Sequence, residues 1–256
     1  MRKLILMCLL LSSISMLAQE TSYRRPKYKD DDVVRTWAID AHIGGGIYQG
    51  AHHEGAEVPK YHFGSTNNAG MLTKFHVEYY LPNTQISVKV GYEHENVTFL
   101  KGEASYDMNQ LMAGGRWYMA PTDWWVQPYV GLDMLYAFDA EHSGFSTSGK
   151  MSFDSQDKNT YEYEGQGKVR LPRFSMGPVV GVDVYLFSSI ALQVEYSYRI
   201  GFDSHYRATY TENGNSNVSY NHGQIHRHAL SVGLKINFPF TFTANDGRSL
   251  LDGLLY

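Results

Sequence analysis

Histidine is the residue type in this sequence that supports the most kinds of chemistry, because an imidazole can bind a metal, act as a base or carry a proton near neutral pH. The chain has 11 histidines. The spacing of His226 and His228 places two imidazoles on one face of a strand. No spacing of carboxylates with histidines marks a particular metal. We therefore predict no metal ligand and no cofactor, with a divalent-metal site as the alternative.

Most histidines fall in segments that we expect to be long loops or the strand ends beside them. His52, His53, His62, His142, His205 and His222 are expected in loops, and His42, His94, His226 and His228 at the adjoining rim. A hydrolase would need a nucleophile or acid to converge with one of these imidazoles. The nearest partners in sequence are Glu93 or Glu95 for His94, and Ser231 for His228. Their expected directions do not converge, so we predict no catalytic residue.

Charged residues that could pair with one another form a second chemical pattern. They recur at alternate positions, opposite rows of apolar residues, and their two signs nearly balance. We expect these groups to lie inside a barrel, where they would form either a structural plug of ion pairs or a transport path. The predicted network consists of Glu78, Lys89, Glu93, Arg116, Asp133, Asp183, Glu195, Arg199 and Lys235. The plug is favoured, because side chains just fill an eight-stranded interior.

Eight segments with period-two alternation must position these groups. Their apolar rows run over 37–43, 75–81, 86–92, 111–119, 124–138, 176–186, 190–200 and 230–240. Alternation with one apolar face is the signature of a β-strand. The sequence therefore predicts an all-β fold.

The connections between these segments alternate in length. Residues 82–84, 120–123 and 187–189 form tight turns, whereas 49–69, 95–107, 140–167 and 202–223 are long. Short turns on one rim and long loops on the other are typical of outer-membrane barrels. We therefore predict an eight-stranded antiparallel up-and-down transmembrane β-barrel with short periplasmic turns and long extracellular loops. A water-soluble sandwich or a soluble ligand-binding barrel is the alternative.

Aromatic residues gather at the expected strand ends, where amphipathic rings suit a membrane interface. The predicted periplasmic girdle is Trp37, Trp117, Trp124, Trp125, Phe238 and Phe240, and the opposite rim carries Tyr48, Tyr92, Phe138 and Phe202. Pro128 and Pro178 interrupt strands, and we expect a bulge or bent hydrogen bonding at Gly177-Pro178.

Weaker alternation appears within two of the long connections. Residues 150–154 and 161–164, and again 206–211 and 217–220, are expected to form hairpins above the membrane. A ten-stranded barrel is the alternative.

The N-terminus has the pattern of an export signal. Arg2 and Lys3 precede an apolar run, and Ala18 offers a small cleavage residue. We predict a signal over 1–18, a flexible periplasmic lead-in over 19–32, the barrel over 33–240 and a periplasmic tail over 241–256. The only cysteine, Cys8, lies in the signal, so disulfides are excluded from the mature chain. The net charge of −4 argues against nucleic-acid binding.

With these segments in place, the chain resembles the small outer-membrane β-barrel domain family of Gram-negative bacteria, the OmpA/OmpX-like eight-stranded type. The resemblance covers residues 33–240 and rests on pattern rather than on a rare motif. It implies that the barrel-insertion machinery reads the last strand, whose alternating apolar residues Leu230 to Phe240 end in an aromatic. The tail departs from the family pattern, in which this strand is terminal. Ser249 could cap a short helical turn in it.

These observations favour a non-enzymatic integral outer-membrane protein with a structural or surface-interaction role. Its expected partners are outer-membrane lipid and lipopolysaccharide, and a host or envelope protein is a further possibility. A subunit of an envelope secretion or assembly complex is the alternative, followed by an outer-membrane hydrolase.

Overall fold

The computed structural model describes most of the predicted barrel. The described residues are 33–48, 52–55, 69–99, 104–120, 124–140, 142–152, 160–212, 218–243 and 246. The predicted signal, the lead-in and the helical turn at Ser249 lie outside this part of the chain. Among the described residues, no helix is long and apolar enough to cross a membrane.

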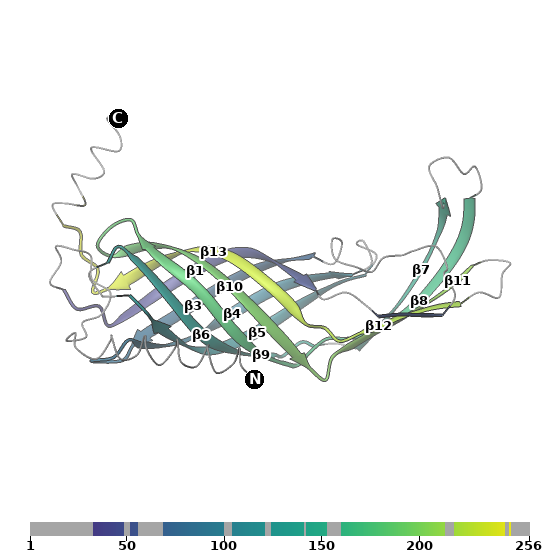
Figure 1. The fold of residues 1–256 in the computed structure, drawn as a ribbon, viewed down its shortest axis with the longest axis horizontal. Helices are drawn as coiled ribbons and strands as arrows, with labels where there is room; N and C mark the ends of the chain where they lie inside the picture. The colour runs from purple at the N-terminus through teal and green to yellow at the C-terminus, as the bar shows by residue number, and fades with distance from the viewer. Residues whose placement is uncertain are drawn as a thin grey trace, which may run out of the picture.

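Eight long strands close into an antiparallel barrel (Figure 1). They are β1 (Trp37–Tyr48), β3 (Ala69–Tyr80), β4 (Ile86–Phe99), β5 (Ala104–Tyr118), β6 (Val126–Ala137), β9 (Phe174–Tyr185), β10 (Ile190–Phe202) and β13 (Arg227–Phe238). Their order around the barrel is β1-β13-β10-β9-β6-β5-β4-β3, so the last strand closes against the first. This confirms the predicted eight-stranded fold, and the ten-stranded alternative is wrong.

A second sheet extends from one end of the barrel. It contains β2 (His52–Gly55), β7 (His142–Ser152), β8 (Thr160–Arg170), β11 (His205–Glu212) and β12 (Val218–Gly223), in the order β2-β12-β11-β8-β7. Figure 1 places it beyond the rim opposite the one at which β13 ends. We call the rim next to the second sheet the sheet rim, and the rim at which β13 ends the tight-turn rim. The pairing of β7 with β8 and of β11 with β12 confirms both predicted hairpins.

One predicted long loop is wrong. The segment 95–107 lies mostly within β4 and β5, which stay paired from Ile86↔Trp117 to Phe99↔Ala104. The apolar row stops at Tyr92 because the next outward positions, His94 and Asn96, are polar. Hydropathy therefore marked the end of the apolar belt and not the end of the strand.

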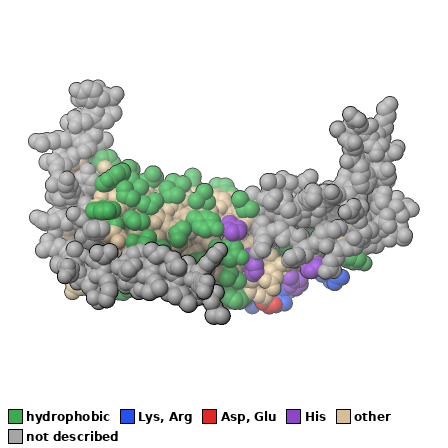
Figure 2. All heavy atoms as spheres, in the orientation of Figure 1, with side chains coloured by type: hydrophobic (Ala, Val, Ile, Leu, Met, Phe, Trp, Pro, Cys, Tyr) green, Lys and Arg blue, Asp and Glu red, His purple; other side chains and the backbone are tan. Residues whose placement is uncertain are grey.

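The barrel is apolar outside and charged inside. Along β13 burial alternates at every residue, and the outward Leu230, Val232 and Leu234 are 44–57% exposed, while the inward Lys235 is fully buried. Figure 2 shows apolar side chains covering the barrel wall. A soluble barrel would bury these rows, so the arrangement is that of a transmembrane barrel. A soluble ligand-binding barrel would need an apolar cavity inside, whereas the interior of this barrel is lined by charged side chains.

The strand irregularity at Gly177-Pro178 is an interruption of the ladder and not a bulge. The pairing of β9 with β10 keeps one register on both sides, from Val179↔Ser197 to Met176↔Ile200, and skips the two residues between. Proline has no N–H to donate. A Cβ on Gly177 would lie 1.7 Å from the carbonyl oxygen of Tyr198, so only glycine permits this approach. The predicted bulge is wrong, and the alternative of disturbed hydrogen bonding is confirmed.

The aromatic residues of the predicted girdle all lie near the tight-turn rim. Trp37 stacks on Phe238 with ring centroids 4.2 Å apart, and Trp124, Trp125 and Phe240 are at least half exposed. The Trp117 indole N–H donates to the Gln85 side chain. These rings form a belt at one end of the apolar wall.

At the sheet rim, two aromatic pairs project outward. Tyr92 lies 6.5 Å from Phe138, and Phe174 lies 5.6 Å from Phe202, measured between ring centroids. The side chain of Tyr48 lies outside the described part. The apolar wall is therefore bounded by aromatic rings at both ends.

Candidate functional site: the charged barrel lumen

The nine residues of the predicted network all point into the lumen. Each has at most 2% of its surface exposed: Glu78, Lys89, Glu93, Arg116, Asp133, Asp183, Glu195, Arg199 and Lys235. They occupy the inward positions of seven strands, as period-two alternation requires. A buried charge is tolerated only when it is paired or hydrogen-bonded, so their contacts decide what the lumen can do.

The charged side chains of the lumen form three levels along the barrel axis: one near the tight-turn rim, one in the middle and one near the sheet rim. Glu195 of β10 lies at the centre of the middle level. Its Oε1 atom lies 2.8 Å from the Lys74 ammonium, and its Oε2 atom lies 3.1 Å from the Arg116 guanidinium. The Tyr129 hydroxyl donates to Oε2 at 3.1 Å, and Lys89 Nζ stands 3.9 Å away. One carboxylate thus faces three cations.

Two further carboxylates balance these cations. Lys89 Nζ lies 3.1 Å from Asp40 Oδ2, and Arg116 Nη1 lies 2.5 Å from Asp133 Oδ1. The middle level is therefore a mixed lattice in which every cation contacts at least one anion.

The level nearest the tight-turn rim is built around Lys235 of β13. Its ammonium lies 2.5 Å from Glu78 Oε2 and 2.8 Å from Asp183 Oδ2, and it donates to the Tyr118 hydroxyl at 2.7 Å. The Tyr118 hydroxyl in turn donates to Glu78 Oε1 at 2.8 Å. A single lysine thus separates two buried carboxylates.

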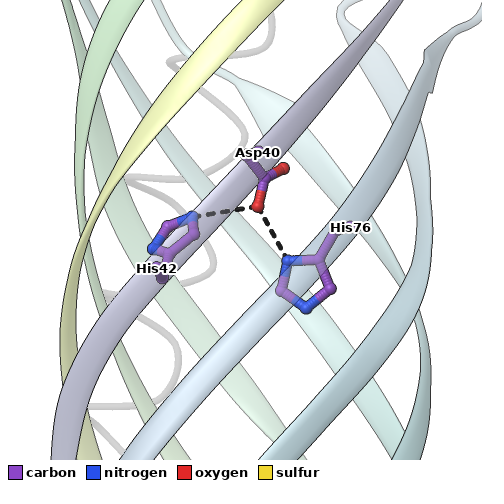
Figure 3. Close-up of side chains that lie close together, drawn as sticks. All are labelled: Asp40, His42 and His76. Atoms are coloured by element: carbon purple, nitrogen blue, oxygen red, sulfur yellow. Dashed lines mark hydrogen bonds and ion pairs between the residues drawn. The ribbon is translucent and has the colours of Figure 1, made fainter.

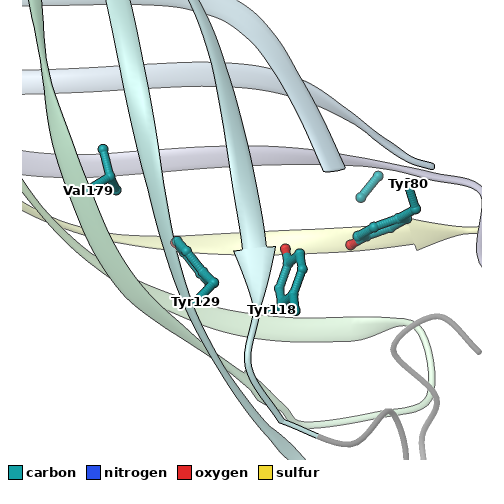
Figure 4. Packing of buried hydrophobic residues seen from close by; sticks show 5 residues of the cluster. Tyr80, Tyr118, Tyr129 and Val179 are labelled. Carbon is teal, nitrogen blue, oxygen red and sulfur yellow. The ribbon is translucent and has the colours of Figure 1, made fainter. Parts of the chain in front are cut away.

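Tyrosine rings fill the space beside this level. Tyr80, Tyr118 and Tyr129 form a buried cluster with Ala38 and Val179 (Figure 4). Neighbouring rings have centroids 6.0 and 5.4 Å apart. The Lys235 ammonium lies 5.2 Å from the centroids of two of these rings, a cation–π distance.

The level nearest the sheet rim pairs two arginines with two glutamates. Arg199 Nη2 lies 2.6 Å from Glu93 Oε2, and Arg227 Nε lies 2.9 Å from Glu95 Oε2. Arg227 also donates to Gln110 Oε1 at 2.8 Å. These contacts form the level of the lumen nearest the second sheet.

Asp40, His42 and His76 form a cluster that links the levels (Figure 3). Asp40 Oδ1 lies 3.0 Å from His42 Nε2 and 2.8 Å from His76 Nδ1. The second ring nitrogen of His76 lies 3.3 Å from Glu93 Oε1, toward the sheet rim. His42 Nε2 lies 2.9 Å from Gln193 Oε1, whose amide donates to Asp183 at 2.6 Å. A hydrogen-bonded chain therefore joins all three levels.

The same three side chains have the donor types of a divalent-metal site. Their possible ligand atoms all lie within 4.8 Å of one another, and two imidazoles with one carboxylate suit zinc. Each of these atoms is already engaged in a hydrogen bond, and the Lys89 ammonium holds the second oxygen of Asp40. A metal would have to displace these contacts, so we assign the cluster to the ion-pair lattice.

Several lattice members were absent from the predicted network. They are Asp40, Lys74, His76, Glu95, Gln193 and Arg227, together with Tyr118 and Tyr129. The first three lie at inward positions of predicted strands, so the alternation contained the signal. Glu95 and Arg227 lie just beyond the predicted strand ends, where the apolar row had stopped.

The predicted location of His42 at the rim is wrong, because His42 lies midway along β1 and points into the lumen, with 3% of its surface exposed. His94 projects to the outer wall and contacts Asn109 at 2.9 Å, away from the inward Glu93 and Glu95. His228 also projects outward, and its Nδ1 atom lies 2.6 Å from the Tyr196 hydroxyl. Neither candidate hydrolase grouping forms.

Both ends of the barrel chain are tied to the β9–β10 turn at the tight-turn rim. The buried guanidinium of Arg35 donates to the Ser188 carbonyl at 3.1 Å and to the Thr241 hydroxyl at 2.6 Å. Asp246 accepts from the Ser188 amide at 3.0 Å and from the Ser188 hydroxyl at 2.7 Å. Asp246 and Thr243 also exchange hydrogen bonds in the manner of a capping box.

Acid is expected to loosen this attachment of the tail. Burial raises the pKa of the Asp246 carboxyl, but hydrogen bonds donated by Ser188 and Thr243 outweigh burial and hold the pKa below the usual aspartate value. The contribution of Asp246 is therefore fully present above the ordinary aspartate pKa and is lost as pH falls through the lower folded pKa. Hydrogen exchange of the Ser188 amide, corrected for its intrinsic rate, should show protection falling over that window. In Asp246→Ala, protection should be low at every pH, and unchanged protection would contradict the prediction.

Comparison with known proteins finds no matching family among protein-family models and no matching relative among curated proteins. Solved structures do match. The Neisserial surface protein A is 12% identical with a TM-score of 0.44, and the match covers 79% of this chain and 97% of that one. The outer membrane protein AlkL is 12% identical with a TM-score of 0.44, covering 88% and 95%. The outer membrane protein OprG from Pseudomonas aeruginosa is 12% identical with a TM-score of 0.35, covering 79% and 97%.

Proposed function

We propose that this chain is a non-enzymatic integral protein of a bacterial outer membrane, with a lumen plugged by ion pairs and a second sheet on the extracellular side. The observation that carries this proposal is the inversion of polarity in a closed barrel. Hydrocarbon offers no hydrogen bonds to a backbone, so a spanning sheet must close completely, as these eight strands do. The predicted signal over 1–18 would supply export.

The plug is supported by the pairing of the lumen cations. Lys74, Lys89, Arg116, Arg199, Arg227 and Lys235 each lie within 4.0 Å of a carboxylate oxygen. Ions crossing the lumen would have to break this lattice at three levels. Single-channel recording of the refolded mature chain in planar bilayers should give a flat baseline, with an open porin as positive control. A steady, large conductance would contradict the plug and favour the transport path.

Two classes of protein partner follow from the proposed location. The barrel-insertion machinery would read β13, which presents Leu230 to Phe238 outward and closes the barrel. An envelope complex would instead contact the tight-turn rim. Crosslinking in cells followed by pull-down in detergent distinguishes these cases: recovery of the barrel with the insertion machinery alone counts against the complex.

An arginine on the outer wall is expected to destabilise the folded barrel. Val194 of β10 pairs with Val182 of β9 and with Val232 of β13, and all three face outward in the apolar belt. Val194→Arg should lower the free energy of unfolding in lipid vesicles by about 2–4 kcal/mol if the site lies at the bilayer midplane. Urea titration of refolded protein, read by its mobility on a gel without boiling, measures this loss.

A matched variant separates the lipid effect from the cost of arginine in a strand. Thr211→Arg places the same side chain at an exposed position of β11 in the second sheet, opposite Glu164 and beyond the apolar belt. It should change the free energy of unfolding little. If both variants fold equally well in lipid, the outer wall does not face hydrocarbon and the proposed membrane insertion fails.

A further inference from the structure

The second sheet carries a row of basic side chains on three adjacent strands. Lys168 of β8 pairs with Arg207 of β11, which in turn pairs with His222 of β12. All three side chains are exposed. Residues directly opposite on antiparallel strands have Cβ atoms about 4.5–5.5 Å apart. The three basic groups therefore lie side by side on one face.

Within this row, Lys168 and Arg207 are like charges directly opposite each other. In the part of the chain that the structure describes, no carboxylate forms an ion pair with Lys168 or Arg207. The neighbouring Asp203 pairs with Arg170 instead, and Glu164 lies two same-face positions away along β8. Like charges directly opposite each other destabilise a sheet, so an anion bound across the row would be stabilising.

The basic face continues the lipid-facing surface of the barrel. From Phe238 back to Tyr220, every even-numbered residue is exposed or half-exposed, so solvent-accessible side chains recur from the apolar belt to β12. At the end of the belt, His228 lies against Tyr198, with ring centroids 4.8 Å apart. In Figure 2, histidines border the apolar wall, and lysine and arginine side chains follow beyond them.

The chemistry of the row suits phosphate. Guanidinium and ammonium groups form strong charge-assisted hydrogen bonds to phosphate oxygens, and a guanidinium does so in a fixed planar geometry. Arg207 lies 5.9 Å from the centre of the Tyr220 ring, which restricts its orientation. A ligand reaching this row from the membrane would place acyl chains along the apolar wall and its headgroup here.

We propose that Lys168, Arg207 and His222 bind the phosphate groups of a phosphorylated outer-leaflet glycolipid of the lipopolysaccharide type. This inference rests on the proposed function, because insertion in the outer membrane is what would place such a lipid beside the barrel wall. It gives the second sheet a specific role: it anchors the lipid layer around the barrel.

Binding of a labelled rough-type lipopolysaccharide to the refolded mature chain in zwitterionic micelles tests this site. The test variant is Lys168→Gln with Arg207→Gln, and the matched control is Arg24→Gln with Lys27→Gln, which removes the same charge ahead of the barrel. At about fivefold per basic residue near an anionic membrane surface, the test variant should bind about 30-fold more weakly. The control should bind as the parent chain does. Added salt should reduce the difference in affinity between the parent chain and the test variant, because it screens exposed charges.

Two further probes identify the ligand chemistry. The dephosphorylated lipid should bind the parent chain about as weakly as the intact lipid binds the test variant, and inorganic phosphate should compete poorly. Equal binding by parent and test variant, equal binding of the dephosphorylated lipid, or displacement by an equal concentration of inorganic phosphate would each overturn the proposal. Resistance to carbonate extraction and heat-modifiable gel mobility are measured on the same samples. If the protein is extracted by carbonate and its gel mobility does not change on heating, the proposed membrane location is wrong, whatever the result for lipid binding.

Discussion

Replacing Glu195 with glutamine is expected to lower the free energy of unfolding of the barrel by about 3–5 kcal/mol. Removing one partner of a buried ion pair leaves the remaining buried charges without a counter-charge. Three cations face this carboxylate, from Lys74 at 2.8 Å, Arg116 at 3.1 Å and Lys89 at 3.9 Å. Glutamine keeps the shape and one oxygen, so the loss reports the charge. Urea unfolding of the chain refolded in lipid vesicles measures it.

Two variants make this result specific to the lattice. Glu164→Gln removes the same charge at an exposed position of β8, where the unfolding midpoint should stay unchanged. Adding Lys74→Gln to Glu195→Gln should recover part of the loss, since it removes one of the stranded cations. If Glu195→Gln unfolds at the same urea concentration as Glu164→Gln, the lumen charges do not hold the barrel together.

The sequence predicted the inward face well because that prediction needs only local alternation. Every second residue of a strand points to the same side, so Glu78, Lys89 and Lys235 could be placed inside without knowledge of their partners. The partners depend on register around the whole barrel. Glu195 lies on β10, whereas Lys74 and Arg116 lie on β3 and β5, which are not neighbours of β10. No spacing in the sequence specifies contacts across the lumen.

The sequence also predicted the strand ends wrongly where a strand extends beyond its apolar row. Above the apolar belt the strands continue with polar residues on both faces, as at Glu95 and Asn96, so the strand ends were placed too early. The short β2 strand joins the second sheet only through pairing with β12, more than 160 residues later. Long-range pairing of this kind leaves no local pattern to detect.

The second large effect concerns the opposite arrangement, in which one cation holds two anions apart. Lys235 contacts Glu78 at 2.5 Å and Asp183 at 2.8 Å, and both carboxylates are fully buried. Lys235→Met fills much of the same volume but leaves two like charges facing each other without water. We expect the free energy of unfolding to fall by about 3–5 kcal/mol.

Rescue experiments distinguish lost charge from lost packing in Lys235→Met. Combining it with Asp183→Asn should recover part of the stability, because one of the facing anions is then neutral. Lys168→Met, at an exposed position of the second sheet, controls for the substitution itself. A loss in Lys235→Met that Asp183→Asn does not reduce would mean that the lysine stem, packed beside Tyr80 and Tyr118, matters more than its charge. The lumen would then be stabilised at this level by ring packing, with ion pairs secondary.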